Sequence, residues 1–484
     1  MNGTAGDAEA IREQLGAKFE AQREAFRRQG FPDHAQRMDA LERLKDGLLR
    51  YQELFVRSLI EDFGNRAAQE TRLLEIFPTV DEIRHTQKHL RGWMRPQRVA
   101  ANWQFMTGRA RVLYQPLGVV GIIGAWNYQL LLSLSPLVCA LAAGNRAMVK
   151  PSETAPRTAD LMQKMIAERF KPEEVAVITG GPEISSAFSS LPFNHLIFTG
   201  STRVGKLVMR AASENLTPVT LELGGKSPAL IHPDYPLERA AERILTGKFW
   251  NAGQTCIAPD YVLLPENMEA EFVELAKRIM PMRYPKIVDN PDYTRMVNRP
   301  GYERMLALVQ DAKSKGGELH QFNPAQEHCN ADNRVMPPTV VAKTNEAMRI
   351  LQEEIFGPIL PIVTYRELDD ALAYINDRPH PLALYYFDSK MQRVDEVLHR
   401  TTSGGVAIND CIFHLPQNNL PFGGVGPSGM GAYHGFDGFA TLSKKKGVFI
   451  QGYGGIQIFK RFLAPPYGRL TDFVIRFLIR NRKL

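Results

Sequence analysis

The sequence predicts an α/β protein with two domains, each built on a parallel sheet. From about Arg109, short apolar runs alternate with helical stretches. This pattern is typical of βαβ units, whose strands are buried on both faces. A second series of runs follows Leu223. The length of 484 residues, with 44% hydrophobic and 23% charged side chains, suits a globular protein of two to four domains.

The predicted elements follow in chain order. The first hundred residues are predicted to be helical, because apolar side chains recur there at spacings of three and four: Leu41, Leu44, Leu48, Tyr51, Phe55 and Leu59. The first series of strands covers 118–123, 147–150, 175–178 and 195–199, with a helix over 158–170. The second series covers 219–223, 227–231, 261–264, 359–364, 382–387 and 405–408.

Residues 112–145 carry no charged side chain. Gly118, Gly121, Gly124 and Pro136 divide this stretch into apolar runs that are shorter than the ~20 residues of a membrane-spanning helix. We therefore expect a buried strand followed by a buried helix.

The excess of positive charge lies in a C-terminal tail. The chain has 59 Lys and Arg against 52 Asp and Glu, a net charge of +7, but residues 444–484 alone carry ten basic side chains and one acid, Asp472. The body is therefore near neutral, which argues against a general nucleic-acid surface.

A helix is predicted near the end of this tail. One of its faces is apolar, and the other carries Arg469, Arg476 and Arg480; the apolar residues are Leu470, Phe473, Val474, Phe477 and Leu478. Such a basic amphipathic helix suits peripheral contact with an anionic membrane, or docking on the subunit or its partner. Both alternatives stay open.

The four cysteines, Cys139, Cys256, Cys329 and Cys411, are widely spaced, and their spacing does not suit zinc. The N-terminus has no basic segment followed by an apolar one. We expect a cytoplasmic protein with free thiols and no metal site.

The segment from Phe198 to Gly205 follows a predicted strand and opens a predicted helix. Its glycines and the helix N-terminus would suit a pyrophosphate. The spacing from Gly200 to Lys206 also approaches a P-loop, but Leu207 stands where a hydroxyl for Mg²⁺ is needed. A purely structural strand-to-helix turn is the third interpretation.

Cys256 lies in the segment Asn251-Ala-Gly-Gln-Thr-Cys. A nucleophilic cysteine must be accessible and have a lowered pKa, and we expect a glycine-rich turn to provide both. Cys139 lies in an apolar helical stretch, where a small buried residue is the better explanation.

Several polar residues stand at the ends of predicted strands. Glu222 ends an apolar strand, where burial would raise its pKa and suit a general base, although it could equally be the polar face of an alternating strand. Asn127 could donate its amide to an oxyanion or simply form a turn. Lys150 and Glu153 follow a strand end, where doubly wound sheets bind ligands, and Glu354 precedes another strand.

Taken together, these segments resemble the aldehyde dehydrogenase superfamily from about residue 35 to 445. The runs 253–261 and 420–431 are similar to its class-3-like branch and, within that, to bacterial coniferyl aldehyde dehydrogenases. The resemblance implies Cys256 as nucleophile, Glu222 as general base and Asn127 in the oxyanion hole. It assigns the following residues to cofactor binding: Trp126, Lys150, Glu153, Gly200, Ser201, Thr202, Gly205, Glu354 and Phe356.

The resemblance also implies a Rossmann-like domain that binds NAD, with NADP as the second candidate, and a homodimer. Its domains would be 1–95 with 116–223 for the cofactor, 224–425 for catalysis, 96–115 with 426–450 for oligomerisation, and 451–484 as the tail. The implied reaction oxidises an aldehyde to the acid through a thiohemiacetal and a thioester.

Three functional alternatives stay open at this point. The aldehyde could be aromatic and resemble coniferyl aldehyde, or it could be a long-chain aliphatic one. A non-redox nucleotide-binding protein on the same fold is the third. Tyr128, Phe413 and His414 could line an aromatic channel or simply pack. Gln129 departs from the proline of many relatives and bears on that channel.

Overall fold

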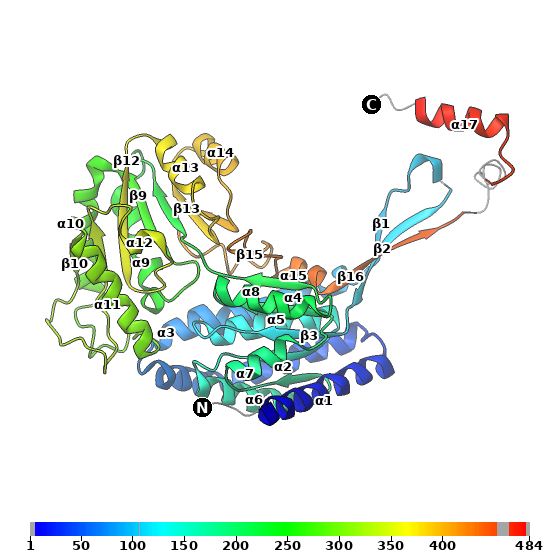
Figure 1. Cartoon of the computed structure of the whole chain (residues 1–484), viewed down its shortest axis with the longest axis horizontal. Coiled ribbons are helices and arrows are strands. Elements are labelled where there is room, and N and C mark those ends of the chain that lie inside the picture. The colour runs from blue at the N-terminus through cyan, green and yellow to red at the C-terminus, as the bar shows by residue number, and fades with distance from the viewer. Residues whose placement is uncertain (1–4, 106, 453–463, 481–484) are drawn as a thin grey trace.

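The computed structural model describes residues 5–105, 107–452 and 464–480. Within these residues it contains two large, mostly parallel sheets with helices against their faces, and a smaller antiparallel sheet that projects from the body (Figure 1). The predicted α/β class is confirmed.

The first large sheet has the strand order β15-β7-β6-β3-β4-β5. Its strands are β3 (Val119–Ile123), β4 (Arg146–Lys150), β5 (Val175–Val177), β6 (His195–Thr199), β7 (Val219–Glu222) and β15 (Gly429–Met430). All neighbours are parallel except β15 and β7. The chain runs outward from β3 to β5 and then returns to β6, on the other side of β3. This reversal is the switch point at which doubly wound sheets bind ligands.

Helices connect the strands of the first sheet and precede it. The connecting helices are α5 (Gln129–Ala143), α6 (Pro156–Arg169), α7 (Pro182–Ser189) and α8 (Thr202–Ser213). The N-terminal helices are α1 (Ala5–Gln29), α2 (His34–Phe63), α3 (Ala68–Thr71), the π-helix η1 (Arg72–Ile76) and α4 (Phe77–Trp93). The apolar stripe predicted from Leu41 to Leu59 is buried on α2, which confirms that helix.

The second large sheet has the order β10-β11-β12-β9-β8-β13-β14. Its strands are β8 (Pro228–Ile231), β9 (Tyr261–Pro265), β10 (Glu318–Gln321), β11 (Thr339–Ala342), β12 (Ile359–Tyr365), β13 (Ala383–Phe387) and β14 (Gly405–Ile408). Its helices are α9 (Leu237–Phe249), α10 (Glu269–Arg283), α11 (Arg299–Ser314), α12 (Arg349–Gln352), α13 (Leu368–Asn376) and α14 (Met391–Arg400). We did not predict β10, because it is a polar, partly exposed edge strand, and we also did not predict the buried strand β11.

The smaller sheet forms an arm with the order β1-β2-β16. It consists of β1 (Gln97–Val99), β2 (Arg109–Pro116) and β16 (Ser443–Ile450), and α15 (Gly435–Thr441) leads into β16. Gly429 and Met430 pair with β7 instead, so part of the segment 426–450 belongs to the first large sheet. In Figure 1 the helix α17 (Arg469–Arg480) lies beyond the arm, away from the two large sheets. Residues 453–463 and 481–484 of the predicted tail lie outside the described residues.

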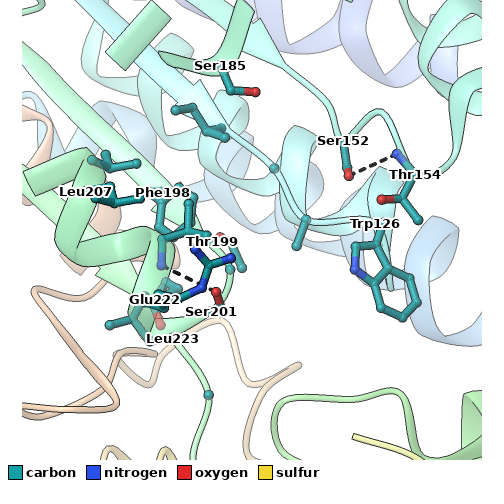
Figure 2. A pocket seen from close by; sticks show the side chains of 18 of the residues that line it. Trp126, Ser152, Thr154, Ser185, Phe198, Thr199, Ser201, Leu207, Glu222 and Leu223 are labelled. Atoms are coloured by element: carbon teal, nitrogen blue, oxygen red, sulfur yellow. Dashed lines mark hydrogen bonds between the residues drawn. The ribbon is translucent and has the colours of Figure 1, made fainter. Parts of the chain in front are cut away.

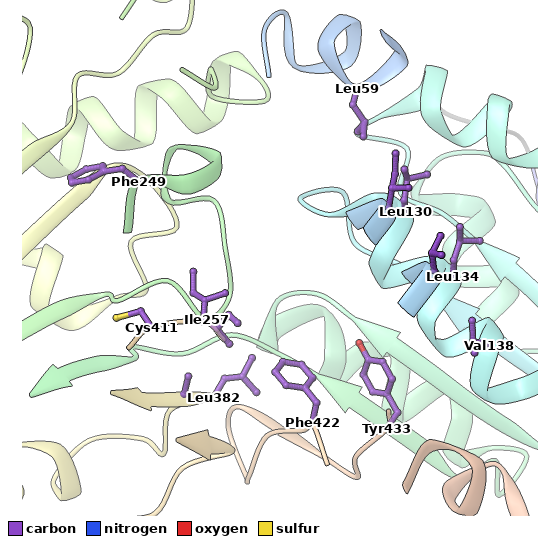
Figure 3. Packing of buried hydrophobic residues seen from close by; sticks show 14 of the residues in the cluster. Leu59, Leu130, Leu134, Val138, Phe249, Ile257, Leu382, Cys411, Phe422 and Tyr433 are labelled. Atoms are coloured by element: carbon purple, nitrogen blue, oxygen red, sulfur yellow. The ribbon is translucent and has the colours of Figure 1, made fainter. Parts of the chain in front are cut away.

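One large apolar cluster joins the two halves of the protein. It includes side chains of α2 and α5 as well as Phe249, Ile257 and Leu382 from the second half (Figure 3). The charge-free stretch from 112 to 145 contributes β3 and the fully buried α5, as predicted. In the described part of the chain, no helix is both long and apolar enough to cross a bilayer.

Candidate active site

A cavity of about 760 Å³ opens at the carboxyl ends of β3, β4, β6 and β7. Figure 2 shows Phe198, Thr199 and Ser201 on one side, with Glu222 and Leu223 close to them, and Trp126, Ser152 and Thr154 on the other. Loops of the second half complete the lining with Cys256, Arg304, Glu354 and Phe356. The cavity therefore lies between the two halves, at the switch point of the first sheet.

The cavity brings most of the predicted site residues together. Its lining includes Asn127, Trp126, Lys150, Glu153, Gly200, Ser201, Glu222, Cys256, Glu354 and Phe356. Thr202 and Gly205 stand outside the lining. The Thr202 hydroxyl donates to the Pro427 carbonyl at 3.1 Å, and Gly205 faces Leu223, whose Cδ2 would lie 2.7 Å from an added Cβ. The predicted roles of all these residues stay predictions.

The glycine-rich turn has the features of an anion site. Ser201 caps α8 by accepting from the Val204 N–H at 3.4 Å, and the twelve-residue helix begins at the cavity wall. A Cβ at Gly200 would come 2.5 Å from the Phe198 ring, so a larger residue there would have to displace that ring. The Thr199 hydroxyl is buried without a hydrogen-bond partner among the described residues. The free Thr199 hydroxyl and the helix N-terminus fit the pyrophosphate of a dinucleotide.

Lys150 and Glu153 form a pair at the end of β4. The Lys150 ammonium lies 2.6 Å from Glu153 Oε2; the Lys150 side chain is 1% exposed and that of Glu153 is 43% exposed. The buried lysine thus orients an exposed carboxylate at the cavity wall. A carboxylate in this position can accept hydrogen bonds from ribose hydroxyls, and it would repel a 2′-phosphate.

Two charged side chains make hydrogen bonds to the backbone of the loop that carries Glu354 and Phe356. Asp260 accepts from the Ile355 N–H at 3.0 Å, and Arg304 donates to the Ile355 carbonyl at 2.6 Å. Phe356 adopts a left-handed φ of 50°, and its ring lies 5.6 Å from that of Trp126. Burial raises the pKa of Glu354 to about 7, and its Oε1 is buried and unpartnered within the described residues. This free acceptor also fits a ribose hydroxyl.

A strained turn presents Cys256 to the cavity. Asn251 and Ala252 have left-handed φ values of 51° and 50°, and a Cβ on Gly253 would lie 2.3 Å from the Gly357 carbonyl oxygen. Cys256 is partly exposed and lines the cavity, so the turn makes the thiol accessible as predicted.

The expectation that this turn lowers the thiol pKa is wrong. Burial, and then the nearby carboxylates of Glu354 and Glu222, raise the pKa of Cys256 to about 12. A thiol with this pKa would need a base that takes its proton in order to act as a nucleophile.

Glu222 ends β7 as a buried carboxyl group. The side chain is 2% exposed, and neither carboxyl oxygen has a hydrogen-bond partner among the described residues. Burial raises the pKa of Glu222 well above its usual range. The alternative that Glu222 marks an exposed polar face is wrong, because Thr220, Leu221 and Glu222 are all buried.

Asn127 joins the turn after β3 to the cysteine turn. Its side-chain N–H donates to the Gln254 carbonyl at 3.1 Å, and the Tyr128 hydroxyl lies 2.8 Å from the Thr255 hydroxyl. These contacts bring the amide of Asn127 close to the segment that carries Cys256. Gln129 is buried and donates to the Ala155 carbonyl at 2.8 Å, so it ties α5 to α6.

The three aromatic candidates differ in their surroundings. Tyr128 is buried against Leu131 and Leu132, with Leu74 and Leu415 packed on this cluster. Phe413 is 47% exposed and meets the Trp250 ring edge-on at 5.9 Å. His414 packs against Tyr385, and burial lowers its pKa to about 4.

Sequence reasoning missed several charged residues around the site. Arg304 holds the Glu354 loop, while Arg66, Glu70 and Glu75 contact the turns that carry Asn127 and Cys256. Arg66 and Glu75 are completely buried. In the sequence these residues are simply charges within helical regions. Exposed charged faces are common on helices, so nothing in the sequence indicated that they are buried.

The chain matches the model of the aldehyde dehydrogenase family over residues 4–448. A "probable coniferyl aldehyde dehydrogenase" of Pseudomonas aeruginosa is 47% identical over 468 residues, which cover 96% of this chain and 97% of that protein. Staphylococcus aureus AldH, solved in a substrate-bound state, is 36% identical with a TM-score of 0.88 and covers 96% of this chain and 99% of its own. An aldehyde dehydrogenase of Mycobacterium tuberculosis in complex with NAD⁺ is 27% identical with a TM-score of 0.83, and the match covers 92% of each chain.

Proposed function

The chain belongs to the aldehyde dehydrogenase family, and from this premise we propose that Cys256, Glu222 and Asn127 carry out its reaction. The enzyme oxidises an aldehyde to the carboxylic acid with NAD(P). The observation that supports these roles most directly is that a partly exposed thiol, an unpartnered buried carboxyl group and a side-chain amide line one cavity.

In the first step the Cys256 sulfur attacks the aldehyde carbon, and the thiol proton passes to the Glu222 carboxylate. The Glu222 oxygens are free to receive it, because they have no hydrogen-bond partner among the described residues. The Asn127 amide and the backbone N–H of Cys256 donate to the new oxyanion. The thiohemiacetal thus forms on the chain's own residues.

The second step needs NAD(P), which when bound would supply the hydride acceptor for oxidation of the thiohemiacetal carbon. Glu354 and Phe356, which line the cavity, and the turn at Gly200 would hold it. Glu222 releases the first proton to solvent and then takes a proton from the water that attacks the Cys256 thioester, which releases the acid and regenerates the Cys256 thiolate. A carboxylate at this position favours transfer of the acyl group to water.

The assignment of the nucleophile is tested by following the absorbance of reduced cofactor with a panel of aldehydes. Cys256→Ala should lose the activity, whereas Cys329→Ala, which changes a thiol outside the cavity lining, should keep it. Equal rates for wild type and Cys256→Ala would overturn the assignment.

We propose an aromatic aldehyde similar to coniferyl aldehyde as the substrate, with a long-chain aliphatic aldehyde as the second candidate. The name of the Pseudomonas aeruginosa relative supports the first. We propose NAD as the preferred cofactor because Glu153 would repel a 2′-phosphate. Kinetics with coniferyl aldehyde and decanal, each with both cofactors, tests both choices. A higher kcat/KM for decanal, or for NADP, would contradict the respective choice.

We propose that the enzyme is a homodimer that pairs through the arm. The strands β1 and β16 form the edges of this sheet, and Trp103, Phe449 and Ile450 are between 44% and 61% exposed. Unpaired strand edges with large apolar side chains suit contact with a partner. Sedimentation velocity should give twice the mass of one chain. A monomer at micromolar concentration would refute the proposal.

We also propose a cytoplasmic location with peripheral membrane contact through α17. Leu470, Phe473 and Phe477 are between 51% and 66% exposed, beside the basic side chains Arg469 and Arg476. The full chain should sediment with vesicles that contain phosphatidylglycerol but not with pure phosphatidylcholine, and removal of residues 465–484 should abolish this binding. Membrane contact would be refuted if the full and the truncated chain sedimented equally with the vesicles. It would also be refuted if the full chain did not bind vesicles and the truncation instead broke the dimer.

The domain assignment is part of the same proposal. Residues 1–95 and 116–223 would bind the cofactor, 224–425 would carry catalysis, and the arm would serve oligomerisation. The connectivity of the two large sheets supports the boundary near residue 223, because β7 ends the first series and β8 begins the second.

A further inference from the structure

A buried charge cluster, formed by Arg66, Glu70 and Glu75, lies between the N-terminal helices and the active-site turns. Arg66 follows α2, Glu70 lies on α3, and Glu75 lies on the π-helix η1. The guanidinium of Arg66 and the carboxylate of Glu75 are 2.9 Å apart, and both side chains are 0% exposed. Because π-helical turns often occur at functional sites, the position of Glu75 on one is consistent with a functional role for this cluster.

Arg66 and Glu75 hold the Asn127 turn at two points. Arg66 Nη1 donates to the Asn127 carbonyl oxygen at 2.7 Å, and Glu75 Oε2 accepts from the Leu130 N–H at 2.8 Å. The guanidinium also lies over the Tyr128 ring, 5.1 Å from its centroid. The ion pair therefore fixes the backbone on both sides of Tyr128, and with it the direction of the Asn127 side chain.

The same cluster holds the cysteine turn. Glu70 accepts from the Asn251 N–H at 2.9 Å and from the Thr294 hydroxyl at 3.2 Å. The Asn251 side chain donates to the Asn127 carbonyl at 3.0 Å, so this oxygen receives hydrogen bonds from both Arg66 and Asn251. The Asn127 carbonyl is thus the point at which the two active-site turns meet.

The cost of burying these charges argues for a positional role. A fully buried ion pair is often no better for stability than apolar side chains of the same volume, because desolvation offsets the attraction. Here the pair also satisfies backbone groups of the Asn127 turn, which apolar replacements could not do. A displacement of about 1 Å at a reacting group can cost on the order of 100-fold in rate.

We propose that Arg66 is a positioning residue for the oxidation, and that it acts by orienting Asn127 toward the oxyanion formed at Cys256. This inference rests on the proposed roles of Asn127 and Cys256. Arg66 does not touch the substrate in this account; it sets the geometry of the turn through the Asn127 carbonyl.

The test is a double-mutant cycle between Arg66→Met and Asn127→Ala, with Arg37→Met as the matched control. Arg37 is also buried and donates to a carbonyl of α5, that of Ala142 at 2.9 Å, but at the end of the helix far from Asn127. The measurements are the rate of the first turnover in rapid mixing, the KM for aldehyde and the affinity for NAD.

Arg66→Met should lower the first-turnover rate about 100-fold, leave NAD affinity within threefold, and have little further effect in the Asn127→Ala background. Arg37→Met should keep the wild-type rate within threefold even if it unfolds at a lower temperature. If Arg66→Met does not fold, Arg66→Lys enters the same cycle. Lysine keeps the charge but lacks the planar fork, so a smaller loss with the same lack of additivity is expected.

Two results would overturn the inference. One is a first-turnover rate for the Arg66 variant equal to that of Arg37→Met. The other is a full additional loss in the Asn127→Ala background, which would mean that Arg66 acts independently of Asn127. Full activity of Asn127→Ala alone would instead overturn the proposed function on which the inference rests.

Discussion

The reactivity of Cys256 without cofactor provides a quantitative test of the site's electrostatics. Burial and the carboxylates of Glu354 and Glu222 raise the pKa of this thiol from 9.0 to about 12. At pH 8 only about one thiol in ten thousand would then be ionised. Iodoacetamide should therefore alkylate Cys256 at a rate that rises about tenfold per pH unit from pH 7 to 10, without a plateau.

Removal of the carboxylate with the larger effect on the Cys256 pKa, that of Glu354, should accelerate the alkylation of Cys256. Glu354 ionises with a pKa of about 7, so at pH 8.5 it is mostly an anion, and Glu354→Gln should lower the thiol pKa. Loss of a nearby like charge is worth about one pKa unit, hence roughly a tenfold faster alkylation. Glu346→Gln is the matched control, because the Glu346 side chain is 58% exposed and pairs with Arg378.

The assay follows the Cys256 peptide by mass spectrometry at each pH, which separates it from Cys329, the other partly exposed thiol. A plateau below pH 9 would show that the thiol titrates with an ordinary pKa. That result, or equal rates for Glu354→Gln and Glu346→Gln, would contradict the proposed effect of the Glu354 charge on the Cys256 thiol.

Three further predictions concern single residues. Asn127→Ala should lower the first-turnover rate by about 10² to 10³, as expected for loss of one oxyanion donor, and an unchanged rate would contradict that role. Gly253→Ala should lower the unfolding temperature and the activity, because its φ is +72° and a Cβ would clash with the Gly357 carbonyl; a wild-type melting curve would contradict this. Burial raises the pKa of Glu82 from 4.5 to about 7, so the folded chain keeps this proton where the unfolded chain loses it, and stability falls as the pH rises from 4.5 to 7. Relative to Glu82→Gln, wild type should lose up to about 3 kcal/mol over this range in urea unfolding, whereas the difference between wild type and the exposed control Glu24→Gln should not change with pH.

The sequence predicted the fold well where apolar runs are continuous. Every predicted strand of both large sheets has a counterpart, because strands buried on both faces leave a clear apolar signal. The edge strand β10 lacked this signal, since an edge strand need not be apolar. The antiparallel pairing of Gly429 with Glu222 is a long-range contact that local patterns do not encode.

The candidate site could be predicted in part. Residues at the ends of strands, such as Asn127, Lys150 and Glu222, meet because parallel strands place their carboxyl ends at one edge. The raised pKa of Cys256 could not be predicted, because it depends first on the burial of the thiol and then on the position of Glu354 in the folded chain. Arg66 was missed for a similar reason: a charge in a helical region looks like an exposed face until the packing is known.

The central claim is that Cys256 forms the acyl intermediate and that Glu222 is needed to release it. The most direct measurement is rapid mixing of Glu222→Gln with NAD and coniferyl aldehyde, followed by mass spectrometry of the Cys256 peptide. We expect a burst of about one reduced cofactor per site, an acyl adduct on Cys256 and loss of steady-state turnover. Full steady-state turnover in Glu222→Gln, or a burst without an adduct on Cys256, would contradict it.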